Sequence, residues 1–277
     1  MHTLLKLLGC FTLTITLLSP AFATPISIDL LSPSTRLSPL NSTYAQTYKY
    51  QEADLSLIVT GWSYGVETKK VTSCQQYNLR GQCTKEKVTT TNSVKQAIEQ
   101  DLVGKWDGLG VEKNDSPTHA VDNEGGDFDM HLLSFDQLVS LTSLSLGWYQ
   151  NDTDISVLAF TGLDFEMSSL LGKKWEDLLD FGWSLVGNYS NVISNPLINP
   201  DKVIAQYWLV GTYNPIFGPL GESSLAKSKN NDQGSDYYKL RGITLEQPPV
   251  TEVSEPNIVL LLTFGLLGLG YARRRRA

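Results

Sequence analysis

Positive charge is scarce in the main part of this chain. Residues 24–256 hold 17 Lys and Arg against 29 Asp and Glu, a net charge of about −12. Phosphate contacts require clustered Lys and Arg, so this balance argues against nucleic acid, and against anionic lipid, as a partner. An acidic domain of this kind is compatible with Ca²⁺ binding or with a role as a soluble component of a cell envelope.

Cysteine is also rare, with three residues in the chain. Cys10 lies in an apolar stretch near the start, which leaves Cys74 and Cys83 as an even pair. In an oxidising compartment such a pair forms a disulfide by default, and no further zinc ligands lie in that stretch. We predict a Cys74–Cys83 bridge across a solvent-exposed hairpin whose turn is residues 78–81.

Long apolar runs occur only at the two ends. At the start, Lys6 precedes an uncharged apolar stretch, residues 7–18, and Ala21-Phe22-Ala23 gives an A-x-A cleavage site before Thr24. This arrangement is typical of a secretory signal peptide, so we predict one over residues 1–23.

The second apolar run, residues 258–272, carries no charge and ends at an arginine cluster, residues 273–276. As a helix it rises roughly 22 Å against a hydrocarbon core of about 30 Å, which makes it a marginal permanent span. The positive-inside rule places the arginines in the cytoplasm. A core helix is the alternative, but it would show a polar face and would not end in four adjacent cations.

This ending has three parts in a fixed order. They are the motif Val253, Ser254, Glu255 and Pro256, then the apolar run, then Arg273, Arg274, Arg275 and Arg276. The order resembles the PEP-CTERM sorting signal of bacterial surface proteins, although Ser254 stands where the family commonly has proline. The resemblance implies an exosortase as a partner and a transient transmembrane helix over residues 257–277. It also implies cleavage near Glu255-Pro256, so that the mature domain is released or attached to the envelope.

Several internal blocks resemble a family of exosortase-dependent surface proteins. The blocks are 60–63, 108–111, 119–123, 146–148, 152–158 and 207–215. This resemblance implies an exported surface protein of unassigned activity, and no catalytic or ligand residues carry over from it.

Alternation of apolar and polar residues dominates the stretch between the two ends, which predicts strands. The predicted strands are 53–61, 139–148, 155–160, 206–210 and 237–245, and the apolar residues 132–135 precede the second of them. Helical spacing occurs at 94–102 and 171–179. We therefore predict an all-β fold: one jelly-roll-like β-sandwich over residues 24–245 with a few short helices, followed by an extended linker at 246–256.

The apolar frame of the 139–148 stretch slips by one residue. It runs Val139, Leu141 and then Leu144, Leu146, Trp148. An extra residue in one strand produces such a slip, so we predict a β-bulge near Thr142-Ser143.

The richest polar stretch runs from His119 to His131. Hard cations need several converging oxygens, and a Gly-containing loop can aim them. The candidate Ca²⁺ ligands are Asp122, Asn123, Glu124 and Asp127. A solvated Asx turn is the alternative, since no EF-hand spacing is present. Asp152 and Asp154 flank another turn and are further candidates for a cation.

Two other patterns suggest a serine hydrolase and a sugar-binding surface. Residues 61–65 match the G-x-S-x-G motif, with Ser63 as nucleophile and Asp122 and His131 downstream in the required order. The residues after the motif lack helical period, which favours a simple turn at a strand end.

The aromatic candidates for stacking on a sugar ring are Trp62, Trp106, Trp148 and Tyr213.

The functional expectation is an exported, non-enzymatic surface or matrix protein, tethered by its tail and processed by an exosortase. The alternatives are a Ca²⁺-assisted module that binds extracellular polysaccharide and a secreted serine hydrolase.

Overall fold

The computed structural model describes residues 24–112, 119–193, 196–221, 235–248 and 273–275. Strands dominate it, which confirms the all-β class. The strands are β1 (Ile26–Asp29), β2 (Thr35–Pro39), β3 (Tyr44–Glu52), β4 (Leu55–Tyr77), β5 (Cys83–Lys105), β6 (Leu109–Glu112), β7 (Val121–Asp122), β8 (Met130–Asn151), β9 (Ile155–Phe160), β10 (Trp183–Tyr189), β11 (Ala205–Thr212) and β12 (Asp236–Glu246). The helices are short 3₁₀ turns: η1 (Glu124–Gly126), η2 (Met167–Leu170), η3 (Trp175–Phe181) and η4 (Pro215–Phe217).

The chain divides into two units. Thr24–Pro248 forms one compact unit, and the other joins Met1–Ala23 with Pro249–Ala277. Of the second unit the structure describes only Arg273–Arg275, so the predicted signal peptide, the motif at 253–256 and the apolar run of the predicted transmembrane helix at 258–272 lie outside the described residues. Among the described residues, no helix is both long enough and apolar enough to cross a bilayer.

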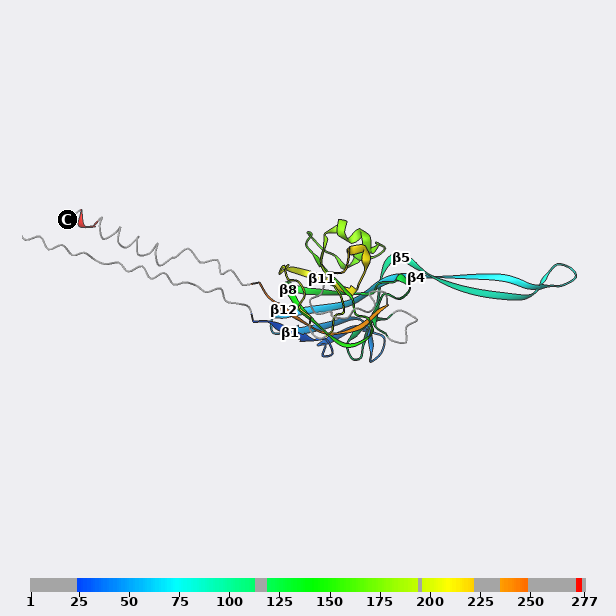
Figure 1. Cartoon of the computed structure of the whole chain (residues 1–277), viewed down its shortest axis with the longest axis horizontal. Helices are drawn as coiled ribbons and strands as arrows, with labels where there is room; N and C mark the ends of the chain where they lie inside the picture. The colour runs from blue at the N-terminus through cyan, green and yellow to red at the C-terminus, as the bar shows by residue number, and fades with distance from the viewer. Residues whose placement is uncertain (1–23, 113–118, 194–195, 222–234, 249–272, 276–277) are drawn as a thin grey trace, which may run out of the picture. The chain divides into compact units, whose positions relative to one another are not determined.

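Six strands close into a barrel in the order β12, β6, β5, β3, β4, β8, with β8 pairing back onto β12. The closing pair is long and runs from Glu246 opposite Ser140 to Asp236 opposite Asn151. Strands β11, β9 and β10 extend the sheet from β8 (Figure 1). We expected two sheets packed as a sandwich. A single sheet closes instead, because β12 has strand partners on both sides and leaves no edge at that point.

Strand β8 serves two parts of the sheet. Its first half pairs with β4 and β11, and its second half pairs with β12. Leu141 and Ser143 lie opposite the consecutive residues Leu245 and Thr244, so Thr142 is an extra residue in β8. This register shift confirms the predicted bulge, and a bulge bends its strand and increases the local twist.

The buried side chains form two clusters on opposite faces of the sheet. Alternation puts Leu55, Leu57 and Val59 of β4 into the first cluster. On β8, Leu133 belongs to the first cluster and its neighbour Leu132 to the second. The second cluster also contains residues of η2 and η3, so the segment with these two turns covers the other face of β4, β8 and β11.

The two helical predictions had different outcomes. The helix expected at 94–102 is wrong, because these residues belong to β5 and Ile98–Asp101 lie opposite Gly61–Tyr64 of β4. Cross-strand packing along a long hairpin outweighs a few apolar residues at helical spacing. The helix expected at 171–179 is met only in part, because the 3₁₀ turn η3 begins at Trp175.

Beyond the barrel, β4 and β5 continue as a two-stranded ribbon (Figure 1). Among the described residues, Val66–Tyr77 pair with β5 alone. Cys74 and Cys83 form the predicted disulfide, with Cα atoms 5.7 Å apart. The Asn78 side chain accepts hydrogen bonds from the N–H groups of Arg80 and Gln82, both at 2.9 Å. The bridge and these bonds fix the tip of the ribbon.

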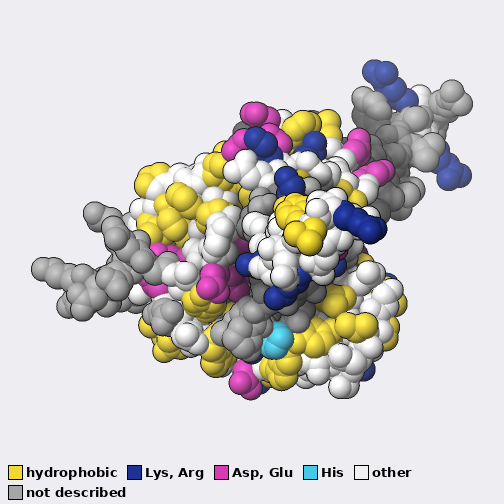
Figure 2. Space-filling model, turned by 90° about the vertical axis from the view of Figure 1, so that its right-hand side faces the viewer, with side chains coloured by type: hydrophobic (Ala, Val, Ile, Leu, Met, Phe, Trp, Pro, Cys, Tyr) yellow, Lys and Arg dark blue, Asp and Glu magenta, His cyan; other side chains and the backbone are white. Residues whose placement is uncertain are grey.

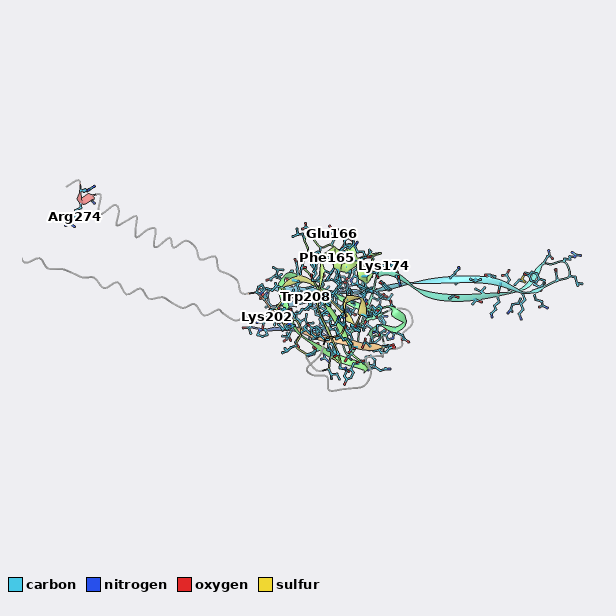
Figure 3. All side chains as sticks on the ribbon, turned by 45° about the horizontal axis from the view of Figure 1, so that its top comes forward. Phe165, Glu166, Lys174, Lys202, Trp208 and Arg274 are labelled. Carbon is cyan, nitrogen blue, oxygen red and sulfur yellow. A yellow bond between two sulfur atoms is a disulfide. The ribbon has the colours of Figure 1, made fainter. Side chains whose placement is uncertain are left out.

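The course of β4 defines two ends of the barrel. The ribbon leaves the barrel at one end, which we call the ribbon end. Figure 2 views this end and shows Lys and Arg side chains grouped near its centre, with Asp and Glu side chains around them. At the other, which we call the far end, lie the β3–β4 turn with Glu52 and Asp54 and the residue Asp136 of β8, which accepts a hydrogen bond from the Ser56 N–H. Strand β12 also finishes there, at Glu246, and Lys202 lies on the same side of the barrel (Figure 3).

Candidate functional site: buried aspartates at the ribbon end

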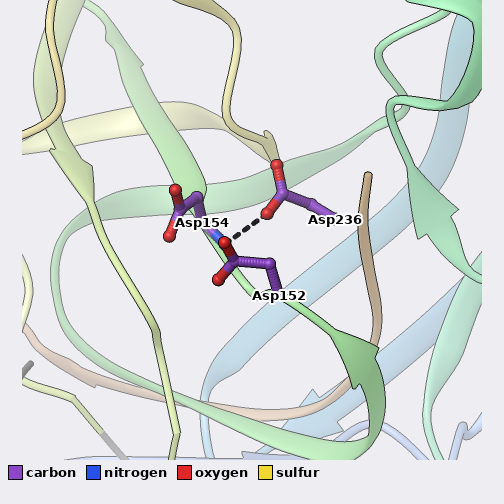
Figure 4. Close-up of side chains that lie close together, drawn as sticks. All are labelled: Asp152, Asp154 and Asp236. Carbon is purple, nitrogen blue, oxygen red and sulfur yellow. Dashed lines mark hydrogen bonds between the residues drawn. The ribbon is translucent and has the colours of Figure 1, made fainter. Parts of the chain in front are cut away.

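Three aspartates meet at the ribbon end of the barrel. Asp152 follows the last residue of β8, Asp154 directly precedes β9, and Asp236 begins β12. Antiparallel pairing of β8 with β12 places Asn151 opposite Asp236, and an isolated bridge joins Asp152 to Asp236. Two segments that are distant in the sequence therefore contribute carboxylates to one place (Figure 4).

The three side chains are buried, with 7%, 3% and 2% of their surface exposed for Asp152, Asp154 and Asp236. Each offers an oxygen that lies within 4.8 Å of the others, and no other group of three acidic, His or Cys side chains meets this condition in the described part of the chain. The Asp236 carboxylate accepts hydrogen bonds from the Asp154 N–H at 2.8 Å and from the Asn123 amide at 2.6 Å. We call these three residues the aspartate cluster.

Burial raises the pKa of the Asp236 carboxyl to about 8, although hydrogen bonds from the Asp154 N–H and the Asn123 amide oppose the shift. The charges of Asp154 and Asp152 raise the pKa further. A carboxyl group with this pKa carries a proton at neutral pH, and that proton offsets the repulsion between the carboxylates. A hard cation such as Ca²⁺ can do the same, because carboxylate oxygens are its preferred ligands. Either a proton or a hard cation would therefore relieve the repulsion among these three carboxylates.

The residues predicted as Ca²⁺ ligands make separate hydrogen bonds in the structure. Asp122 accepts a hydrogen bond from the Glu124 N–H at 3.0 Å, which is the Asx turn that we had set against the metal site. Asp127 accepts one from the Tyr64 N–H at 2.9 Å. Asn123 instead joins the aspartate cluster, since its side chain also accepts a hydrogen bond from the Asp236 N–H. Ca²⁺ binding by these four residues stays a prediction.

The sequence pattern points to Asp152 and Asp154 as candidates for a cation but not to Asp236. The only local signal at Asp236 is its place immediately before the last predicted strand. Its proximity to Asp152 depends on the register between β8 and β12, and those two strands are separated by many residues. No local pattern could therefore have placed Asp236 in the cluster.

The G-x-S-x-G stretch lacks the strand–turn–helix geometry that exposes a nucleophile. Gly61–Gly65 lies inside β4, and Ser63 is 1% exposed and donates a hydrogen bond to Asp101 at 3.3 Å. The imidazole of His131 donates to the carbonyl of Leu109, and burial lowers its pKa to about 4. The Ser63 hydroxyl is therefore directed to Asp101 rather than to His131.

The candidate sugar-stacking aromatics make their contacts within the protein. Trp62 is 1% exposed. The exposed Trp106 stacks on His119 with ring centroids 4.6 Å apart, and the ammonium of Lys239 lies 4.9 Å from the Trp106 ring and 5.1 Å from that of Trp148. These contacts favour a structural role for Trp62, Trp106 and Trp148, since stacking on a sugar requires an accessible ring face.

No protein-family model matches this chain, and neither a curated protein nor a solved structure matches it. What the chain does must therefore be inferred from its own residues.

Proposed function

We propose that this chain is an exported cell-surface or extracellular-matrix protein with a non-enzymatic role. The observation that carries the proposal is the Cys74–Cys83 disulfide. Disulfides persist in oxidising compartments and are rare in the cytosol. This bridge lies near the tip of a solvent-exposed ribbon, where a reducing solvent would reach it.

The proposed route uses both ends of the chain. Residues 1–23 direct export, residues 257–277 hold the chain in the membrane with the arginines in the cytoplasm, and an exosortase cuts near Glu255-Pro256. The acidic composition of residues 24–256 supports a soluble role after processing, because net charge far from zero favours solubility. Strand β12 ends at the far end of the barrel, opposite the ribbon.

Mass spectrometry of the protein from its native host tests this proposal. We expect a mature chain that begins at Thr24 and ends near Pro256, with Cys74 and Cys83 resistant to alkylation until a reductant is added. Replacing Arg273–Arg276 by alanine should leave the tail uncut. A full-length chain in the cytosol with reduced thiols would contradict the proposal.

A second candidate, Ca²⁺-assisted binding of extracellular polysaccharide, draws support from the aspartate cluster alone. It predicts that millimolar Ca²⁺ raises the melting temperature, that Asp152→Asn removes the increase, and that Ca²⁺ increases binding on a glycan array. An unchanged melting temperature after EGTA treatment, with no metal found by elemental analysis, would exclude the Ca²⁺ part.

A further inference from the structure

We propose that the ribbon docks on the far end of a second copy of this chain, so that copies associate head to tail. The proposal concerns the folded, oxidised chain and does not depend on the route of export.

The ribbon offers a preformed surface with no partner among the described residues. Its side chains over residues 69–91 are exposed almost throughout, and Tyr77 and Leu79 at the tip are large apolar groups that face solvent. The disulfide and the Asn78 hydrogen bonds hold this tip in one conformation. Docking a preorganised surface costs little additional ordering entropy.

Charge selects the kind of partner. The ribbon, residues 66–94, holds five Lys and Arg and two acidic residues, Glu67 and Glu86, which gives a net charge of +3. The rest of residues 24–256 holds 12 basic and 27 acidic residues, a net charge of −15. Two ribbons would repel each other, and lysines along strand edges oppose edge-to-edge pairing. The ribbon therefore fits an anionic surface, and the body of this chain is itself anionic.

The far end presents acidic and apolar groups together. Glu52, Asp54 and Asp136 are exposed there, and they outnumber the exposed cation Lys202 on the same side. Leu138 and Ile204, which are 54% and 44% exposed, lie beside them, because Val139 pairs with Ala205. A tip with Tyr77, Leu79 and Arg80 complements this surface in both polarity and charge. The aspartate cluster at the ribbon end is buried and does not compete for the tip.

The two surfaces lie at opposite ends of the same barrel, because β4 begins at the far end and leaves the barrel at the ribbon end. A contact between different patches on two identical copies is heterologous, and it continues from copy to copy unless its rotation closes a ring. Head-to-tail association therefore suits a protein that forms a layer or matrix.

Charge reversal tests the contact in the full chain, oxidised and kept in a mild non-ionic detergent so that residues 258–272 do not associate by themselves. Sedimentation should show assemblies at about 0.05 M salt that dissociate at about 0.5 M salt, where charges are screened within a few ångströms. Reversal at the tip, Arg80→Glu with Lys85→Glu, should weaken association about tenfold or more. Reversal at the far end, Glu52→Lys with Asp54→Lys, should do the same.

Mixing the two charge-reversed variants provides the decisive control. When mixed, they should form a one-to-one complex, because the acidic tip of one now meets the basic far end of the other. Lys173→Glu with Lys174→Glu, on the body, changes the net charge as much as the tip reversal and should leave association unchanged. A chain that stays monomeric at low salt would overturn the proposal, as would association that survives the tip reversal. Binding of an anionic polysaccharide by a monomeric chain would assign the ribbon to that partner instead.

Discussion

The barrel and the ribbon are built from the same two strands but are stabilised differently. Within the barrel, β4 pairs with β3, β5 and β8, and its residues Leu55, Leu57 and Val59 are fully buried. In the ribbon, β4 pairs with β5 alone among the described strands, and Val71 and Tyr77 are exposed. Packing holds the barrel, whereas a hydrogen-bond ladder, a turn and a disulfide hold the ribbon.

This difference predicts that the two regions unfold separately. Stability is not uniform within a protein, and regions with few buried apolar contacts open at lower free energy than the core. Changes in the barrel should therefore alter global stability, while changes in the ribbon should alter local opening only. The following substitutions test that distinction.

The largest effect is expected for Trp208→Ala. Trp208 is fully buried in the first cluster and its indole N–H donates to the Ala205 carbonyl at 3.1 Å. Its removal should lower the free energy of unfolding by about 3–5 kcal/mol, measured by urea denaturation. Leu79→Ala in the ribbon should change it by no more than about 0.5 kcal/mol. Similar losses for the two variants would contradict the distinction between barrel and ribbon.

Features that depend on neighbouring residues along the chain could be predicted from the sequence. The slip between Leu141 and Leu144 correctly predicted the bulge at Thr142, and the two cysteines with the turn between them correctly predicted the disulfide-bonded hairpin. In each case the structural constraint lies within about ten residues, where alternation and turn chemistry operate.

Features that are set by pairing between distant segments could not be predicted from the sequence. Closure of the barrel depends on β12 pairing with both β6 and β8, and the position of Asp236 depends on the same register. The helix wrongly expected at 94–102 failed because local spacing says nothing of the strand opposite. Registers of this kind are fixed by tertiary packing rather than by intrinsic propensity.

The next effect concerns pH and the aspartate cluster. The pKa of Asp236 is about 8 in the folded chain against an ordinary value of 3.8, so between these values the folded state binds more protons than the unfolded state. The stabilisation from this group is complete below pH 3.8 and is lost as pH rises towards 8. Its slope is at most about 1.4 kcal/mol per pH unit, measured by urea denaturation between pH 5 and 8.

Asp236→Asn should flatten this slope, because an amide does not titrate. Asp164→Asn, at an exposed loop carboxylate, is the matched control and should keep the slope of the native chain. A slope unchanged in Asp236→Asn would show that Asp236 does not take up the proton.

A smaller and local effect is expected from replacing both Cys74 and Cys83 by alanine. The bridge spans nine positions, and in the chain-entropy model a loop of this size contributes roughly 2–3 kcal/mol. Because the ribbon makes few contacts with the barrel, most of this loss should appear as faster amide exchange over residues 69–91. A fall of the barrel's own unfolding free energy by the full amount would show that barrel and ribbon unfold together.

The smallest effect comes from a pair of matched glycines. Gly81 in the ribbon has φ +77° and Gly172 in the body has φ +74°, and a Cβ on either would meet nothing within 4 Å. Alanine at either position should cost about 1–2 kcal/mol of backbone strain without a steric clash. Gly172→Ala should lower global stability by this amount, since the Gly172 N–H donates to Ile98 of β5 within the barrel. Gly81→Ala should leave global stability unchanged and speed amide exchange in the ribbon about tenfold. Equal global losses for the two variants would mean that the ribbon unfolds as part of the barrel.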